Sequence, residues 1–333
     1  NQSFSLKLKS TDYDFRVHEG SLQILFSEKG KLLVYNISNS KFLVIDSFSF
    51  NCSADNYQDW LYCNDTFYYL TQDALYIESL GHSDSVILDF SSVSPNLFLY
   101  NGHKYNRMEK IGPFIYHQLY DPNCWHADTP LCQEYTLSSS INIQKGKVTP
   151  LPNNKFPRHL ENSVFPFTAG ISMLKFGNSL IYNFVQEPDI YVYNLKLETF
   201  KAYKAKSAFQ EYEIVRYSPE FNSRSGYAQR FLIQSPEYRG VFASCSDDYF
   251  FRIFLKGQDL LDSEGELNKS AHRKQVIQII DSNFKVVKEI DNLLNPKVHI
   301  PEIYCVSGEI LVRKYAESDS ILAFDRLDID LPE

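Results

Sequence analysis

Ile190-Tyr191-Val192-Tyr193-Asn194, followed after a short turn by Phe200-Lys201-Ala202-Tyr203, is the stretch that decides the fold. A run of apolar and aromatic residues ends in a polar residue, a turn follows, and a second run begins. Runs of this length and composition, separated by turn residues, predict two antiparallel β-strands joined by a short connection.

The same pattern returns along the chain at irregular intervals. Its copies are residues 32–36 before 42–46, 74–78 before 86–89, a weaker copy at 141–143 before Val148, 276–281 before 285–288, and 321–325. Repeated hairpins of this kind are typical of radially arranged sheets, that is, of a β-propeller. The 23 Tyr and 25 Phe residues also favour strands, because aromatic side chains fit pleated, half-buried surfaces.

Six units follow when the chain is divided strand by strand. Their approximate bounds are 3–48, 50–92, 93–152, 165–205, 206–290 and 291–333. The sequence therefore predicts an all-β fold in which residues 1–333 form a single six-bladed β-propeller domain with four-stranded antiparallel blades. Neighbouring units bury each other's apolar faces in such repeats.

The two chain ends complement each other. The last unit lacks an outermost strand, and residues 4–9 alternate apolar and polar side chains with no partner in their own unit. We therefore expect the N-terminal strand to pair with the C-terminal strands and close the ring, which would remove two sheet edges. Pro236-Glu237 and Pro301-Glu302 precede apolar runs and suit the first residue of an innermost strand, where a missing N–H costs least.

The charge and hydropathy of the chain restrict the classes of partner that it could bind. The net charge of −8 and pI of about 5.6 argue against nucleic acid, whose recognition needs clustered Lys and Arg. No apolar run approaches the ~18 residues that a membrane span needs. The chain begins at Asn1 without an initiator Met, which leaves room for a leader or a lipid anchor upstream.

The six cysteines do not form a dense disulfide scaffold. Cys124 and Cys132 flank a compact loop that a disulfide would close, and Cys52 with Cys63 is a second candidate pair. Cys245 and Cys305 lie in strand-like contexts and are expected to be inert buried thiols. A bridge in the 124–132 loop would favour an oxidising compartment.

The C-terminal half resembles a family of six-bladed TolB-like propellers of unknown function from Bacteroidota, mostly lipoproteins or periplasmic proteins. The resemblance rests on four segments: Ile190 to Leu195, Tyr238-Arg239-Gly240-Val241 with residues 249–254, residues 276–289, and residues 303–324. It implies six blades and an exported, periplasmic or outer-membrane-associated location. The family supplies no catalytic residues.

Aromatic and polar residues gather in the third and fourth units. Loops at one mouth of a propeller channel commonly bind ligands, with aromatic side chains for stacking and polar groups for orientation. Trp125 and His126 would suit a sugar or a peptide, although an insertion that packs its own aromatics explains them equally. Arg239 suits a carboxylate or phosphate, or an ion pair to Glu237 or Asp248. The candidate ligand-binding residues are His117, Tyr120, Trp125, His126, Arg158, His159, Tyr238 and Arg239.

Catalytic and metal motifs are missing from the sequence. There is no G-x-S-x-G, no dinucleotide or P-loop motif, and no local His pair. The acidic positions Asp247-Asp248 and Glu187/Asp189 suit β-turns, and they lack the spacing of a Ca²⁺ loop. We therefore predict no catalytic residue, no metal ligand and no cofactor. Ca²⁺ is the one ion that the acidic turns could bind, but their spacing does not indicate a site.

These observations favour an exported, non-catalytic binding propeller that recognises a glycan, a peptide or a partner protein at one mouth of its channel. The alternative is a propeller hydrolase or lyase with a metal or carboxylate site at the channel, since propellers host both. A purely structural assembly component is a third possibility. Converging carboxylates and a His at one mouth would favour the enzyme.

Overall fold

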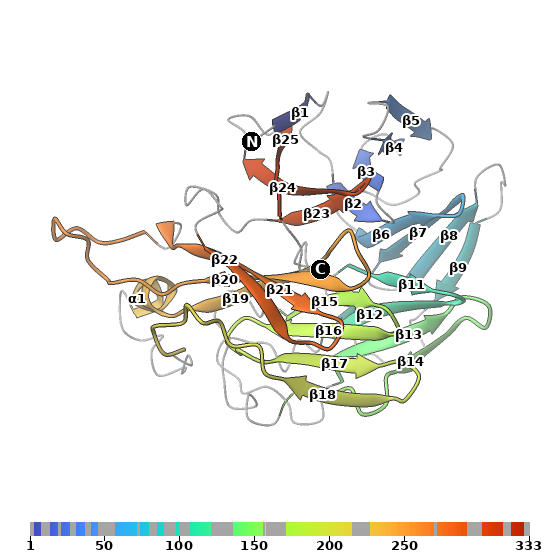
Figure 1. Cartoon of the computed structure of the whole chain (residues 1–333). Helices are drawn as coiled ribbons and strands as arrows, with labels where there is room; N and C mark the ends of the chain where they lie inside the picture. The colour runs from blue at the N-terminus through green and yellow to red at the C-terminus, as the bar shows by residue number, and fades with distance from the viewer. Residues whose placement is uncertain are drawn as a thin grey trace.

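A computed structural model describes most of the chain. The described residues are 3–7, 14–18, 21–26, 31–36, 41–45, 57–71, 74–79, 85–89, 98–99, 107–120, 136–155, 157, 171–214, 227–269, 272–291, 302–315 and 321–329. Their strands form six antiparallel sheets, five of four strands and one of five. Figure 1 shows the sheets fanned around a common centre in chain order, so the fold is an all-β propeller.

Two of the four-stranded sheets come from the N-terminal part of the chain. The first contains β2 (Asp14–His18), β3 (Ser21–Phe26), β4 (Lys31–Asn36) and β5 (Lys41–Ile45). The second contains β6 (Tyr57–Cys63), β7 (Thr66–Thr71), β8 (Ala74–Ser79) and β9 (Ser85–Asp89). Each sheet is a simple meander, with consecutive strands as neighbours.

Two more four-stranded sheets follow the five-stranded one. The first contains β15 (Ile171–Phe176), β16 (Ser179–Phe184), β17 (Ile190–Asn194) and β18 (Thr199–Tyr203). The second contains β19 (Glu237–Ala243), β20 (Tyr249–Leu255), β21 (Gln275–Asp281) and β22 (Val286–Asp291). The sequence predicts only strands here, but the helix α1 (Tyr227–Gln234) precedes β19.

The fifth four-stranded sheet joins the two ends of the chain. It consists of β23 (Ile303–Val306), β24 (Glu309–Tyr315), β25 (Ile321–Arg326) and β1 (Ser3–Lys7). The strand β1 is antiparallel to β25, with Ser3 opposite Asp325 and Lys7 opposite Ile321. In Figure 1 the blue β1 lies beside the red β25. The pairing expected between the N-terminal strand and the C-terminal strands is therefore present.

The unit predicted at 93–152 departs from the four-stranded pattern. It contains β10 (Phe98–Leu99), β11 (Glu109–Ile111), β12 (Phe114–Tyr120), β13 (Ser138–Asn142) and β14 (Lys147–Pro150). The prediction of six four-stranded blades is therefore wrong: five sheets have four strands, and in this one two short strands share the edge of β12. The turn at Gly112, whose φ is +56°, sets Ile111 opposite Phe114, so β11 covers only the first half of β12.

The recurring sequence pattern is the third strand of a sheet with its turn into the outermost strand. Asn194 ends β17, and its side-chain oxygen accepts hydrogen bonds from the backbone N–H groups of Lys196 and Leu197 at 3.0 and 2.8 Å. Asn142 and Asp281 cap the turns after β13 and β21 in the same way. A side-chain oxygen that accepts hydrogen bonds from the N–H groups two and three or four positions on explains why these three runs end in Asn or Asp.

The apolar core lies between neighbouring sheets. One cluster of buried side chains runs from β6 and β7 through β12 and β13 to β15–β17, and it includes Leu61, Ile115 and Tyr182. Another joins β20 and β21 to β23 and β24 through Phe251 and Ile303. These clusters bury apolar side chains between neighbouring sheets, which is how thin repeats become stable.

The first strands of the sheets meet at the centre of the molecule. Contacts join β2 to β6 and β23, and β19 to β15 and β23. The predicted Pro-Glu positions stand at the starts of two of these inner strands, since β19 begins at Glu237 and β23 directly after Glu302. The strand β19 contains a bulge at Gly240, whose φ of +64° shifts the register between Arg239 and Val241.

Candidate functional site

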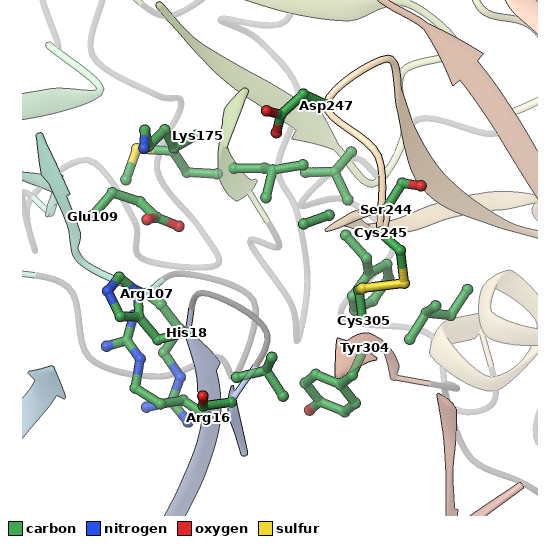
Figure 2. A pocket seen from close by; sticks show the side chains of 18 of the residues that line it. Arg16, His18, Arg107, Glu109, Lys175, Ser244, Cys245, Asp247, Tyr304 and Cys305 are labelled. Carbon is green, nitrogen blue, oxygen red and sulfur yellow. A yellow bond between two sulfur atoms is a disulfide. The ribbon is translucent and has the colours of Figure 1, made fainter. Parts of the chain in front are cut away.

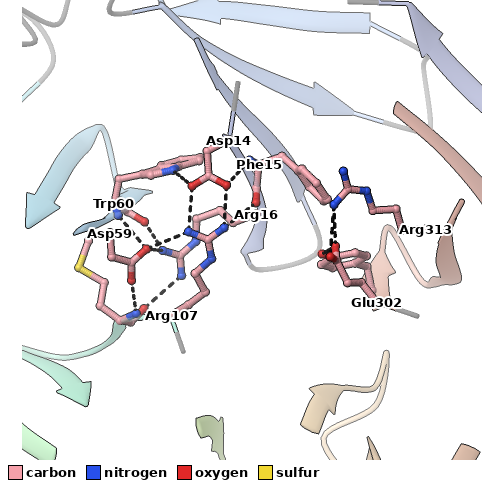
Figure 3. A network of polar contacts seen from close by, with 10 residues as sticks. Asp14, Phe15, Arg16, Asp59, Trp60, Arg107, Glu302 and Arg313 are labelled. Atoms are coloured by element: carbon pink, nitrogen blue, oxygen red, sulfur yellow. Dashed lines mark hydrogen bonds and ion pairs between the residues drawn. The ribbon is translucent and has the colours of Figure 1, made fainter. Parts of the chain in front are cut away.

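A charged layer lies where the inner strands begin. Arg107 precedes β11 and donates to both oxygens of Asp14, at 2.9 and 2.8 Å, and to Asp59 at 3.1 Å. The indole N–H of Trp60 also donates to Asp14, at 2.7 Å. Figure 3 shows how these contacts connect β2, β6 and the segment before β11. The layer therefore ties together three inner strands from distant parts of the sequence.

The electrostatics of this layer favour its ion pairs. Burial alone would raise the pKa of Asp14, but the Arg107 guanidinium overrides it and lowers that pKa. Burial would likewise lower the pKa of Arg107, and Asp14 and Asp59 raise it instead. Arg16 donates to the carbonyls of Trp60 and Met108 and lies 3.8 Å from Asp59. The contacts of these groups join β2, β6 and the segment before β11, so the layer serves the architecture.

A second part of the layer surrounds Phe15. Arg313 lies 3.2 Å from Glu302, and the Tyr304 hydroxyl donates to the same carboxylate. The Arg313 guanidinium sits 4.8 Å from the centre of the Phe15 ring, which packs 5.5 Å from Tyr304. These contacts join β2 to β23 and β24 (Figure 3).

A cavity of about 650 Å³ lies against this layer. Its lining comes from β2, from residues 107–110, from β15, from β19 with the turn after it, and from β23 with the turn after it. These are inner strands of five different sheets, so the cavity occupies the hub of the propeller. The turn residues Ser244, Asp247 and Ser307 place its mouth at the end where the inner strands finish. The volume lies within the range typical of small-molecule sites.

Glu109, the first residue of β11, points into this cavity in Figure 2. Burial raises the pKa of its carboxyl to about 7, although Arg16, Lys175 and a backbone hydrogen bond at Lys175 oppose the shift. Near neutral pH this group therefore takes both the protonated and the ionised form, which suits either proton transfer or a hydrogen bond to a ligand.

His18, the last residue of β2, lines the same cavity. The pKa of its imidazole is lowered to about 3. Burial is the largest cause, and the positive charges of Arg16, Lys175 and Lys110 act in the same direction. The ring is thus neutral at physiological pH, with one nitrogen protonated and the other not. Figure 2 shows His18 and Glu109 on the same side of the cavity, with Lys175 beyond Glu109.

A disulfide borders the cavity on the opposite side. Cys245, in the turn after β19, is bonded to Cys305 in β23, and their Cα atoms are 5.1 Å apart. The prediction that both are inert buried thiols is wrong, because the hub brings together two strands that are 60 residues apart in sequence. Figure 2 shows the bridge facing Glu109 and Lys175 across the cavity. Cys52, Cys124 and Cys132 lie outside the described residues, so the two other bridges stay predictions.

The described members of the predicted site do not line this cavity. Tyr238 is fully buried, where its hydroxyl accepts from the Ser207 N–H and donates to Gln210, both at 2.8 Å. The Arg239 guanidinium pairs with Glu237 at 2.6 Å, which is the structural alternative that the sequence offered. Both residues stand at the start of β19, far along the strand from the mouth.

His117 and Tyr120 belong to β12, and His117 does not line the cavity either. His117 is 1% exposed, and burial lowers the pKa of its imidazole to about 4. Tyr120 ends the strand opposite Phe98. The remaining candidates, Trp125, His126, Arg158 and His159, lie outside the described residues.

Sequence reasoning missed the groups that surround the cavity. Glu109 sits in the mixed-charge run Arg107-Met108-Glu109-Lys110, and Arg16 and His18 alternate along one strand. The acidic residues at the inner strands were a usable signal, since Asp14, Glu237 and Glu302 each stand at or next to the start of one. Nothing in the sequence shows that these segments meet.

In the part of the chain that the structure describes, no group of three His, Cys, Asp or Glu side chains is placed to hold a metal ion. Within the same ranges, none of the helical segments combines the length and the apolar character that crossing a bilayer requires.

The fold is similar to solved structures, although the sequence matches no known family. No protein family matches the sequence, and no curated protein is similar to it. Among solved structures, the chain is similar to a member of the DUF4221 family from Bacteroides vulgatus, with a TM-score of 0.69, 11% identity, and 97% and 95% of the two chains covered.

A second similar structure comes from Bacteroides fragilis and is assigned as an exported protein. Its TM-score is 0.50 at 12% identity, with 97% of this chain and 94% of that chain covered. At these identities the likeness shows the fold alone. It agrees with the expected resemblance to propellers of unknown function from Bacteroidota.

Proposed function

We propose that this chain is an exported, non-catalytic binding propeller that holds its ligand in the hub cavity. The observation that carries the proposal is the 650 Å³ cavity, which five sheets line with both polar and aromatic side chains. The ligand is a small molecule or the exposed end of a glycan, a peptide or a partner protein. The dimensions suit a group of about one or two sugar rings.

The architecture in this proposal is a single six-bladed domain of the TolB-like kind. In this proposal the sheet of residues 98–150 counts as the sixth blade, and the observed pairing of β1 with β25 would close the ring. Closure of this kind would hold the inner strands around a fixed hub and keep the cavity preformed.

Export is supported by two observations. The bridge between Cys245 and Cys305 is at a partly exposed position, and exposed disulfides persist in oxidising compartments. The similar Bacteroides fragilis structure is assigned as exported. A periplasmic or outer-membrane-associated lipoprotein fits both observations.

Crystals soaked with a panel of monosaccharides, disaccharides and dipeptides test the binding proposal. We expect bound molecules in the hub cavity, and we expect Ala243→Trp, at the cavity wall, to exclude them. Lys201→Trp, on the exposed outer strand β18, is the matched control and should leave binding intact. Ligands that bind elsewhere, or that bind Ala243→Trp equally well, would contradict the proposal.

One observation favours an enzyme as the second candidate. Glu109 and the neutral His18 face the same cavity, and a carboxyl with a pKa near 7 is suited to general acid–base chemistry. A hydrolase or lyase of this kind predicts turnover of nitrophenyl glycosides or unsaturated products from acidic glycans, and Glu109→Gln should abolish it. Turnover that survives this substitution would remove Glu109 from the mechanism.

A further inference from the structure

The cavity differs in charge from the rest of the chain. The protein carries a net charge of −8, yet the cavity lining holds twice as many permanent cations as carboxylates. The cations are Arg16, Arg107, Lys110 and Lys175, and the carboxylates are Glu109 and Asp247. A cationic pocket in an acidic protein is a feature of the site and not of the overall composition.

The two arginines are neutralised by the layer beneath the cavity. Arg107 forms ion pairs with Asp14 and Asp59. Arg16 is only 4% exposed and contacts Asp59 and two backbone carbonyls. The charges available to a ligand therefore come from the two lysines.

Neither Lys110 nor Lys175 forms an ion pair with a carboxylate among the described residues. Lys110 extends over the Tyr68 ring, with its Nζ 5.8 Å from the ring centre. Lys175 is exposed on β15 and projects beside the cavity in Figure 2. Because no ion pair neutralises either ammonium group within the described ranges, both can attract an anion from solution.

The field at His18 is positive. Burial is the largest cause of its low pKa, and the three charged groups that add to it, Arg16, Lys175 and Lys110, are all cations. The imidazole is therefore a neutral hydrogen-bonding group in a region where negative charge is stabilised.

Glu109 is the one carboxylate deep in the described lining, since Asp247 stands exposed at the mouth. In its protonated form Glu109 adds no negative charge and offers an O–H donor. In its ionised form its negative charge offsets the positive charge of one lysine. The affinity of the cavity for an anion should therefore depend on the protonation of this single group.

Resting on the proposed function, we propose that the hub cavity takes a small organic anion. Its carboxylate or sulfate group lies between Lys110, Lys175 and His18, and the protonated Glu109 strengthens its binding. The titratable and charged groups that face Glu109 come from every neighbouring inner element: Arg16 and His18 from β2, Asp59 from β6, Arg107 and Lys110 from its own segment, Lys175 from β15, Asp247 from the turn after β19, and Tyr304 from β23.

Calorimetric titration with sugars of the same ring size tests this inference. The probes are glucuronate, glucose and glucosamine, together with inorganic sulfate as a competitor. We expect glucuronate to bind at least about tenfold more tightly than glucose at pH 6, and glucosamine to bind least, because only the first brings a negative charge. Competition by sulfate would show that the anionic group alone is recognised.

Variants separate the roles of the two kinds of charge. In the wild type, the affinity for glucuronate should fall about five- to tenfold between pH 6 and pH 8, as Glu109 ionises. Glu109→Gln should bind at pH 8 as the wild type does at pH 6. Lys175→Ala should weaken glucuronate about fivefold and leave glucose unchanged, whereas Lys201→Ala, on the outer strand β18, should change neither.

The outcomes also distinguish this inference from the proposed function. If glucose or glucosamine binds as tightly as glucuronate and Ala243→Trp blocks that binding, the cavity is a binding site but the ligand is not an anion. Absence of glucuronate binding at 10 mM (about the top of a practical titration), or a wild-type affinity independent of pH, also overturns the inference. The soaking experiment then decides separately whether the cavity binds anything.

Discussion

At the residue scale, Glu109 and His18 show how burial changes the chemistry of ordinary side chains. Both line one cavity, and burial disfavours the charged form of each. The carboxyl therefore holds its proton to higher pH, and the imidazole stays neutral to lower pH. Each group costs stability where it would be charged, so their pH dependences run in opposite directions.

The sign can be worked out for Glu109. The folded protein keeps this proton up to pH about 7, whereas the unfolded chain releases it near 4.5, the usual pKa of a glutamate side chain. The destabilisation is therefore complete above pH 7 and disappears as the pH falls towards 4.5. We expect Glu109→Gln to raise the free energy of unfolding by about 1–3 kcal/mol at pH 8, with no gain at pH 4.5.

His18→Asn is the matched comparison. The folded pKa is about 3 and the unfolded value 6.5, so the wild-type imidazole costs stability below pH 6.5 and not above it. The asparagine variant should therefore resist acid better and behave like the wild type at pH 8. Urea melts at pH 5 and pH 8 measure both effects. An unfolding free energy of Glu109→Gln that tracks the wild type at both pH values would mean that Glu109 is not buried as described.

At the scale of elements, the third strand and its turn are locally encoded. Asn142, Asn194 and Asp281 each accept hydrogen bonds from their own turn, so the polar residue that ends the apolar run fixes where the strand stops. The inner strands behave differently. Their charged residues find partners on other sheets, as Asp14 does with Arg107, 93 residues away.

The bridge between Cys245 and Cys305 is the element-scale feature that we expect to matter most for stability. It joins β23 to the turn after β19 and closes a loop of 60 residues. Loop-closure entropy for that length corresponds to about 3–4 kcal/mol. We expect the double variant Cys245→Ser/Cys305→Ser to unfold at a Tm lower by roughly 5–10 °C, measured by calorimetry.

A reductant supplies the internal control. Reduced wild-type protein should melt like the double variant, and free thiols counted by mass spectrometry confirm that the bond is open. If the double variant keeps the wild-type Tm, the bridge does not constrain the hub.

At the scale of the whole molecule, the two chain ends share one sheet. The strand β1 pairs with β25 over five residues, so the sheet that ends the chain also contains its beginning. Without β1, the edge of β25 would present unpaired N–H and C=O groups, which are a template for association with another chain.

Removal of residues 1–8 tests this arrangement. We expect the truncated chain to lose about 2–5 kcal/mol, because four or five backbone hydrogen bonds are lost, and to associate in size-exclusion chromatography. A synthetic peptide of residues 1–8 added in excess should restore the Tm, whereas a scrambled peptide should not. A monomeric truncated chain with the wild-type Tm would show that β1 contributes nothing to the stability of the sheet or to covering the edge of β25.

Much of the architecture was readable from the chain. The strands, the turns, the Pro-Glu starts of β19 and β23 and the pairing of the two ends follow from residues close together or from complementary patterns. The five-stranded sheet and α1 were not foreseen, because β10 and β11 are two and three residues long and carry little pattern of their own.

By itself, the sequence determined that this protein is a propeller of antiparallel sheets, since strand periodicity and turn chemistry act between neighbouring residues. Only the tertiary structure decided what lies at the hub. The Cys245–Cys305 bond, the pairing of Arg107 with Asp14 and Asp59, and the meeting of Glu109 with His18 and Lys175 join separate sheets. The reason is physical: each inner strand contributes one or two side chains to the cavity, and burial changes their protonation only after all the sheets have assembled.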